Sequence, residues 1–403
     1  MSAPPLLRII AVPKPGTTPL HHLLVSNSCD VIVGRRRCRR LGHLLRPDQT
    51  RAARPRDRAV FHPAQSGWLT RELPVDVDRP DIGSDYEPVI LRAYELYREL
   101  VEESGQTDIM VKTGFLDLAP HRNFPAYQLP HNWRSEDLSI QQVKERFPQF
   151  QIGEPYWGAY DPEGALLRPE VTITTYVRLA MQRGAHILGN TKVLDWKSDA
   201  GGVTVITDRE THTADRIVFC AGPWTGKLLM ELGIAVTVTR LSFAWVWPLT
   251  NFKAYEPESL PCWCIEDEDG IYHGFPMMSD VPGYKIGLHW YGETVDPDSF
   301  NRTPNAQDEE FIRKGLRRYF PDANSPLVAL RICLYDHTGD DVPIIDQLPG
   351  HDHVTLCGPR CGAGVKFIPA YAEIAADFVE KGRTDLESDF LRFGRLLPGA
   401  QAS

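Results

Sequence analysis

The sequence contains no apolar run of the roughly 18–20 residues that a helix needs to span a bilayer. Its first residues lack the basic start and continuous apolar stretch of a secretory signal. Only eight cysteines occur in 403 residues, too few for a disulfide framework. We therefore expect a cytoplasmic protein that does not enter a membrane, and residues 401–403 are not a peroxisomal signal.

An excess of basic residues is also missing. Lys and Arg total 44 against 53 Asp and Glu, which gives a formal net charge of −9. Nucleic-acid-binding proteins usually carry a basic surface, so we expect no such partner. The average hides one segment, because residues 35–58 contain ten arginines, no lysine and two acidic residues. That segment carries +8, and the rest of the chain carries −17.

Two common motifs of catalytic and metal sites are absent. Without a Gly-x-Ser-x-Gly motif, a hydrolase of the α/β class lacks its nucleophile. Cys262 and Cys264 are separated by one residue, and Cys357 and Cys361 by three, whereas structural zinc sites typically use two. We therefore predict no metal site.

The patterns that are present predict an α/β fold. Residues 30–34, DVIVG, form a short apolar run that ends in glycine, as where the first strand of a dinucleotide-binding domain meets its phosphate loop. Residues 35–80 show neither helical nor strand periodicity. Beyond Gly83, apolar residues at helical spacing alternate with short apolar strands, and residues 235–300 are rich in strand patterns. This mixture predicts an α/β protein with an antiparallel second domain.

Four motifs follow one another in the second half of the chain. They are VFCAGPW at 218–224, GIYHGFP at 270–276 with GYKIGLH at 283–289, RICLY at 331–335 with DDVPIID at 340–346, and CGPRCGAGVKF at 357–367. With these motifs, residues 84–395 and the strand at 30–34 resemble the monomeric sarcosine oxidase / N-methyltryptophan oxidase family. Members are FAD-dependent oxidases of the D-amino-acid-oxidase superfamily. Several ordered motifs are far more specific than one glycine pattern.

The resemblance implies catalytic roles for five residues. Lys285 would lie over the flavin, where a cation stabilises the charge that develops on dioxygen. His289 and Tyr335 would line the substrate pocket, and Lys366 would bind the substrate carboxylate. Lys285 and His289 are four residues apart, so on a strand they share a face. His273 stands where the family often has tyrosine, so the resemblance does not define which substrate is bound.

The resemblance also implies how FAD is held. Cys333 would carry a covalent thioether to the flavin, because a thiolate is a strong nucleophile. Small residues in the first and fourth motifs would let the backbone approach the cofactor, and the helix that follows would point its positive end there. The fourth motif departs from the family at Pro359 and Arg360. The predicted cofactor-binding residues are Gly34, Ala221, Gly222, Cys333, Gly362, Gly364 and Lys366.

The implied architecture is a Rossmann-like FAD-binding domain, whose first βαβ unit is disrupted in this chain, and a second, antiparallel-sheet substrate domain. Residues 1–29 would be a poorly ordered N-terminal extension. The remaining ranges are 30–82, 150–225 and 330–395 for the FAD-binding domain, and 83–149 and 226–329 for the substrate domain.

The implied activity is oxidation of the C–N bond of a secondary or N-methyl amino acid to an imine, with O2 reduced to H2O2 by a monomeric enzyme. An oxidase of L-pipecolate or another imino acid is the near alternative. A second alternative belongs to another class: a non-catalytic relative that has lost FAD because of residues 35–80.

The family needs a Gly-x-Gly-x-x-Gly loop and a Ser-His-Gly-x-Thr/Ser-Arg segment between residues 34 and 82, and neither is present. Basic residues that are all arginine are typical of GC-rich codons read out of frame. Codons for residues 34–45, read one base later, can spell Ala-Gly-Val-Val-Ala-Val-Gly-Ser-Ala-Thr-Tyr-Tyr, and those for 66–70 can spell Gln-Gly-Gly-Ser-Arg. We hypothesise that residues 35–80 are an out-of-frame translation; true divergence is the alternative.

Sequencing the gene and its transcript tests this hypothesis. We expect the frame shifted by one base to be open across codons 35–80 and to encode the glycine-rich loop. Stop codons in that frame, or the absence of such a loop, would leave divergence as the explanation.

Overall fold

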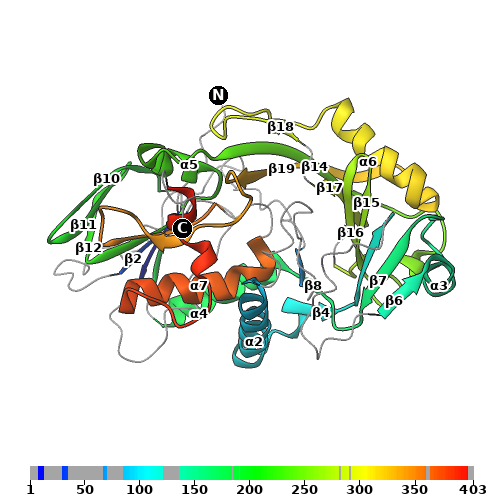
Figure 1. Ribbon diagram of the computed structural model, residues 1–403, viewed down its shortest axis with the longest axis horizontal. Coiled ribbons are helices and arrows are strands. Elements are labelled where there is room, and N and C mark those ends of the chain that lie inside the picture. The colour runs from blue at the N-terminus through cyan, green and yellow to red at the C-terminus, as the bar shows by residue number, and fades with distance from the viewer. Residues whose placement is uncertain are drawn as a thin grey trace, which may run out of the picture.

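The computed structural model describes residues 8–12, 30–34, 67–69, 85–120, 136–183, 185–189, 191–280, 283–289, 292–359 and 364–397. In these residues, two large sheets lie side by side with helices around them, which confirms the predicted α/β class (Figure 1). Within this described part, no helix is long and apolar enough to cross a membrane.

The first large sheet has six strands in the order β20-β21-β13-β2-β1-β9. Its strands are β20 (Ile345–Gln347), β21 (Val354–Cys357), β13 (Arg216–Cys220), β2 (Asp30–Gly34), β1 (Arg8–Val12) and β9 (His186–Leu188). β13 and β21 run parallel, with Phe219 beside Leu356. Their carboxyl ends therefore open at one edge of the sheet, which is where open α/β sheets bind ligands.

Helices and a small sheet cover the two faces of this six-stranded sheet. On one face α2 (Glu87–Ser104), α4 (Pro169–Gln182) and α7 (Gly364–Lys381) share an apolar core with the sheet. On the other face the core includes buried residues of α5 and of β11 and β12, two strands of the three-stranded β10-β11-β12 sheet. These elements are α5 (Thr225–Leu229), β10 (Val193–Asp199), β11 (Gly202–Thr207) and β12 (Thr211–Ala214).

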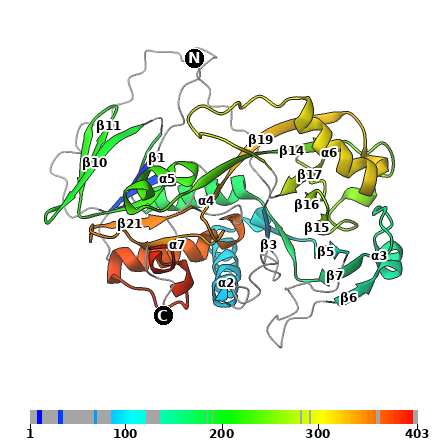
Figure 2. The ribbon, with the colours of Figure 1, turned by 45° about the horizontal axis from the view of Figure 1, so that its top comes forward.

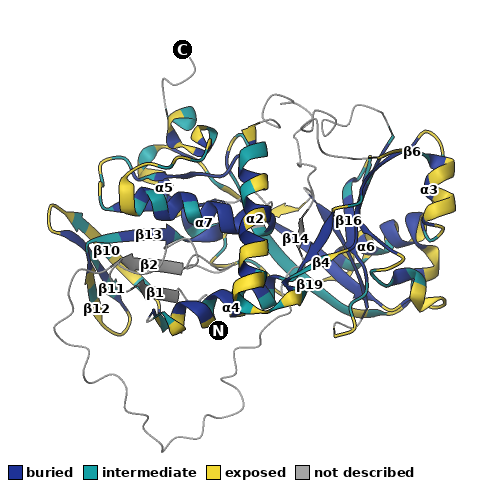
Figure 3. Cartoon of the chain, turned by 90° about the horizontal axis from the view of Figure 1, so that it is seen from below, coloured by how far each residue is buried: buried dark blue, intermediate teal, exposed yellow. Residues whose placement is uncertain are grey.

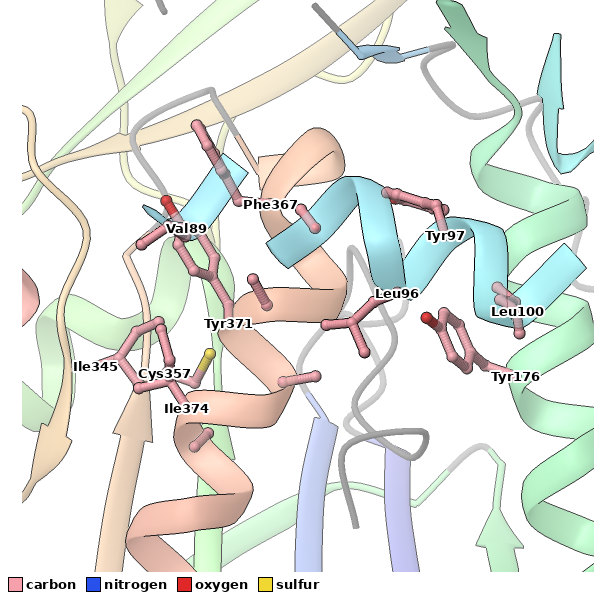
Figure 4. Packing of buried hydrophobic residues seen from close by; sticks show 14 of the residues in the cluster. Val89, Leu96, Tyr97, Leu100, Tyr176, Ile345, Cys357, Phe367, Tyr371 and Ile374 are labelled. Atoms are coloured by element: carbon pink, nitrogen blue, oxygen red, sulfur yellow. The ribbon is translucent and has the colours of Figure 1, made fainter. Parts of the chain in front are cut away.

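The helical side of the core is built largely from α2 and α7. Figure 4 shows Val89 of α2 near Tyr371 of α7, and Leu96 and Leu100 of α2 near Tyr176 of α4. Outside this core, Arg92 of α2 donates two hydrogen bonds of 2.8 Å to the carboxylate of Glu373 on α7. Most of α7 is buried against α2 and the sheet (Figure 3).

Helix α7 begins earlier than predicted. The sequence predicts a start at Pro369, but the helix starts at Gly364 and contains Pro369. Proline has no N–H, so it cannot bond the carbonyl four residues before it. Here Tyr97 of α2 donates its hydroxyl to that carbonyl, on Val365, over 2.7 Å. The tertiary contact thus satisfies the acceptor and allows proline inside the helix.

The second large sheet contains most of the remaining strands, in the order β18-β14-β17-β16-β15-β5-β7-β6 with β19 also paired to β14. Its pairs are antiparallel except for β15 with β5. Figure 2 shows β14 and β19 as long neighbouring strands. The strands are β18 (Glu293–Thr294), β14 (Thr237–Val246), β17 (Tyr284–His289), β16 (Gly270–Phe275), β15 (Cys262–Asp267), β5 (Phe115–Ala119), β7 (Trp157–Asp161), β6 (Glu136–Ser139) and β19 (Leu327–His337).

Alternation along these strands divides the second sheet into two faces. Tyr284, Ile286 and Leu288 of β17 lie in an apolar core with alternate residues of neighbouring strands. Helix α6 (Ala306–Tyr319) and helix α3 (Ile140–Arg146) contribute to that core. We call this the back face. The opposite face, which we call the front face, contains Lys285, Gly287 and His289 of β17 and their cross-strand neighbours.

A small sheet of β3 (Gly67–Leu69), β8 (Ala165–Leu167) and β4 (Met110–Lys112) completes the fold. Leu166 of β8 packs with Cys262, Cys264 and Phe275 of the front face. The β3-β8-β4 sheet therefore covers the front face around Cys262, Cys264 and Phe275.

Several predictions about the domains differ from the packing. Helix α2 lies within residues 83–149, the predicted substrate domain, but packs with the first sheet. Strands β7 and β19 lie in ranges predicted for the FAD-binding domain, but they pair in the second sheet. Strand β1 lies in the extension predicted to be poorly ordered. Its five residues, RIIAV, are mainly apolar and partly β-branched, which suits a strand paired with β2.

Candidate active site

Three of the predicted catalytic residues lie on adjacent strands of the front face. Lys285 and His289 are on β17, and His273 is on β16, opposite Gly287 of β17. Directly opposed residues of a sheet point to the same face. All three side chains are buried, with at most 8% of each residue exposed.

Glycine at position 287 gives His273 its place. A Cβ atom there would lie 2.7 Å from Cε1 and 2.9 Å from Nε2 of the His273 ring, so the imidazole packs directly over the Gly287 backbone. The ring centres of His273 and His289 are then 5.9 Å apart, with nearly perpendicular planes. Burial, with Lys285 nearby, lowers the pKa of His273 to about 3, so this ring is neutral at pH 7.

Tyr335 joins this group from β19. Its hydroxyl and Nδ1 of His289 are hydrogen-bonded at 2.9 Å. Burial raises the pKa of Tyr335 well above its ordinary value and lowers that of His289 well below its own, so both are neutral at pH 7. Cys333 lies two residues earlier on β19, on the same face, and is half-buried.

Lys285 lies among aromatic rings. Its Nζ is 4.7 Å from the ring centre of Phe243, 4.9 Å from that of Phe275 and 5.6 Å from that of Trp245. Phe275 and Trp245 are its direct cross-strand neighbours, so the register of the sheet builds these surroundings. Burial lowers the pKa of Lys285 to about 7, although Cys333 and other acidic groups nearby act in the opposite direction.

Lys366 faces this group from the first turn of α7 and is 3% exposed. Its charge contributes, after burial and His273, to the lowered pKa of His289. It also lowers the pKa of Asp117 on β5, against the larger effects of burial and Glu266. Lys366 therefore lies within electrostatic range of both β17 and β5.

The sequence reasoning missed two acidic residues of this site. Glu170, in the first turn of α4, is close enough to Lys285 to interact electrostatically, and its Oε1 is buried without a hydrogen-bond partner among the described residues. Burial raises the pKa of Glu170. Asp117 lies on the front face, and the only available signal was an acidic residue inside an apolar strand, FLDLA.

The carboxyl ends of β13 and β21 form the second part of the site. Gly222 follows β13 in the left-handed conformation, φ 50°, which favours glycine. Oγ1 of Thr225 is buried with no partner among the residues that the structure describes. A Cβ atom on Gly358 would lie 3.3 Å from that oxygen. Small residues, a polar atom available for bonding and the start of α7 at Gly364 fit the flavin end of FAD.

One of the predicted cofactor residues, Gly34, does not lie at this edge. β2 runs antiparallel to β13, with Asp30 opposite Cys220 and Gly34 opposite Arg216. Gly34 therefore lies at the opposite end of the strand pair from Ala221, roughly 17 Å along the strand at about 3.4 Å per residue. A phosphate-binding strand would run parallel instead, so β2 as it is placed does not bring Gly34 to the flavin edge, and the cofactor role of Gly34 stays a prediction. Gly362, and most of residues 35–80, fall outside the described residues.

Known proteins share this arrangement and sequence. The family model described as FAD dependent oxidoreductase, DAO, matches residues 35–378. A monomeric sarcosine oxidase from Bacillus sp. is 30% identical over 322 residues, 78% of this chain and 82% of its own length. N-methyl-L-tryptophan oxidase from Escherichia coli is 31% identical over 322 residues, 78% and 84% of the two chains.

Solved structures show the same fold. NikD, described as an unusual amino acid oxidase essential for nikkomycin biosynthesis, superposes with a TM-score of 0.70 at 20% identity, over 82% of this chain and 86% of its own. Glycine oxidase from Geobacillus kaustophilus gives 0.65 at 19%, over 81% and 86%.

A sheet edge that fits a flavin, beside a second sheet with buried lysine, histidine and tyrosine, is the architecture of a flavin-dependent oxidoreductase. The chain belongs to the FAD dependent oxidoreductase (DAO) family, which confirms the resemblance that the sequence motifs indicate.

Replacing Lys285 by Met tests its burial. The lysine pKa is about 7 in the folded chain and 10.5 ordinarily, so between these values the unfolded chain binds more protons and wild-type stability rises with pH. Lys285→Met should therefore stabilise the protein most at or below pH 7, by roughly a few kcal/mol at about 1.4 kcal/mol per pKa unit, with the gain shrinking towards pH 10. Urea unfolding at pH 7, 8, 9 and 10 measures this.

The exposed Lys197 provides the control, since Lys197→Met should leave the pH dependence unchanged. A stability difference for Lys285→Met that stays constant from pH 7 to 10 would contradict the buried, neutral lysine.

Proposed function

We propose that the protein is an oxidase of a secondary or N-methyl amino acid that converts the C–N bond to an imine and O2 to H2O2. The observation that carries this proposal is the placing of Lys285 among aromatic rings beside His273, His289 and Tyr335, with Lys366 facing them. The names of the similar proteins, sarcosine oxidase and N-methyl-L-tryptophan oxidase, support it.

Lys366 would bind the carboxylate of the substrate, because a buried ammonium gains most from an ionised partner. His273 and His289 are neutral at pH 7, so neither repels the substrate amine, and each can accept a hydrogen bond. The hydrogen bond between Nδ1 of His289 and the Tyr335 hydroxyl fixes how that ring is oriented, and when Nδ1 donates, Nε2 is the nitrogen that accepts. Together these side chains would hold the amine on the front face beside Lys285.

FAD, when bound, accepts the hydride equivalent from the substrate and delivers the electrons to O2. Gly222, Thr225 and the start of α7 would hold its ring system. Lys285 would stabilise the negative charge that develops on dioxygen, and the surrounding rings exclude water, which strengthens that interaction. The protonated fraction of Lys285 falls as pH rises through about 7, and its contribution falls with it.

A peroxide-release screen with sarcosine, N-methyltryptophan, L-pipecolate and proline tests the function, using the chain as it stands and a frame-corrected version. We expect peroxide from an N-methyl amino acid. Lys285→Met should slow reoxidation by O2 about 100-fold or more while substrate still bleaches the flavin absorbance. Peroxide from L-pipecolate or proline alone indicates the imino-acid oxidase, and colourless protein that gains no flavin indicates the non-catalytic relative.

We also propose that Cys333 attaches the flavin covalently. It is half-buried and interacts electrostatically with Lys285, which favours the reactive thiolate. Cys262 also lies near Lys285, but burial raises its pKa to about 12 and makes a thiolate rare. After acid precipitation, flavin should stay with the pellet in the wild type and in Cys262→Ser, and should leave it in Cys333→Ser. Flavin in the wild-type supernatant would contradict the attachment.

A further inference from the structure

Asp117 is an acidic residue in a strand built for packing. Its neighbours Leu116 and Leu118 lie in the back-face core with no exposed surface. Asp117 points the other way, opposite Cys264 of β15, which in turn is opposite His273 of β16. These three side chains therefore form one row across the front face, which continues to Gly287 of β17.

Within the part of the chain that the structure describes, the carboxylate of Asp117 has no ionic partner in contact. Among the described residues, it accepts a hydrogen bond from the backbone of Leu118 and makes no ion pair, and Lys366 acts on it only at longer range. Glu266 on the adjacent strand adds a second negative charge. Asp117 is half-buried, and partial burial of a carboxylate without a cation is still unfavourable, so packing alone would favour an apolar residue here.

The row also places Asp117 beyond the reacting centre. Neighbouring strands are about 4.8 Å apart, so β5 lies roughly 14 Å from β17, which contains Lys285, and roughly 10 Å from β16, which contains His273. Lys366 is within electrostatic range of both His289 and Asp117. When the substrate carboxylate binds Lys366 and the substrate amine points towards β17, the substrate side chain extends towards β5.

We infer that Asp117 determines specificity by binding a positively charged group, an ammonium or guanidinium, at the end of the side chain of the amino-acid substrate. This inference rests on the proposed function, since it names the substrate class of the same site. The side chain would pass His273, whose neutral ring allows a cation to approach, beside Cys264, which Leu166 covers. Lys366 and Asp117 would then bind the two opposite charges of one substrate.

Calorimetric titration of the flavin-loaded protein tests this binding without catalysis. The probes are 4-aminobutanoate and 6-aminohexanoate, each matched with butanoate or hexanoate, which share the carboxylate but lack the ammonium. We expect at least one amino acid to bind about tenfold or more tightly than its partner, as a charged hydrogen bond provides. Asp117→Asn should remove that preference and Asp117→Glu should restore part of it.

Glu258→Gln, an exposed acidic residue outside the row, is the matched control and should keep the wild-type preference. Equal affinities within both pairs, a preference that survives in Asp117→Asn, or no binding by any of the four probes would each overturn the inference.

Oxidation separates this inference from the function on which it rests. We expect Nα-methyl-lysine to exceed N-methylnorleucine, of equal chain length, in kcat/KM by about tenfold or more, and Asp117→Asn to equalise them. Peroxide from both substrates at equal rates sinks the role of Asp117 and leaves the oxidase intact. No peroxide from any N-methyl amino acid sinks the function, while the calorimetric result still decides whether Asp117 binds a cation.

Discussion

The register of the second sheet is the constraint on which the site depends. The two-residue period of a strand sends Tyr284, Ile286 and Leu288 into the back-face core and leaves Lys285 and His289 on the front. A slip of one residue would exchange the two sets and bury the lysine in an apolar core. The hydrophobic energy of the back face therefore maintains the positions of the polar groups in front.

The front face contains ionisable side chains whose burial opposes folding and which are suited to catalysis. Desolvation of Lys285 and of the two histidines lowers their pKa values, which means that burial of their charged forms is unfavourable. Perturbed groups of this kind cluster at functional sites. The aromatic rings around Lys285 partly compensate, since the face of a π system attracts a cation. Stability lost on this face is offset by the two cores behind the sheets.

Strand pairing within the second sheet and a helix from the first sheet decide how the site is assembled. Strands β14 and β19 pair along their length, so Tyr335 and Cys333 of β19 reach the face that contains His289. Helix α7 starts at the edge of the first sheet and presents Lys366 to the second. Because Tyr97 of α2 bonds the carbonyl that Pro369 leaves without a donor, α2 supports this first turn. This long-range contact joins α2 to α7, although the predicted domain ranges separate them.

The sequence by itself determined the α/β class, the family and the strand parity that puts Lys285 and His289 on one face, because periodicity and motifs are local properties. It did not reveal Asp117 or Glu170 as members of the site, or that β2 is antiparallel to β13. Those features depend on which strands pair and in which register, and that choice is made by burial between residues distant in the chain. Only the tertiary structure therefore placed an acidic residue of β5 in line with His273.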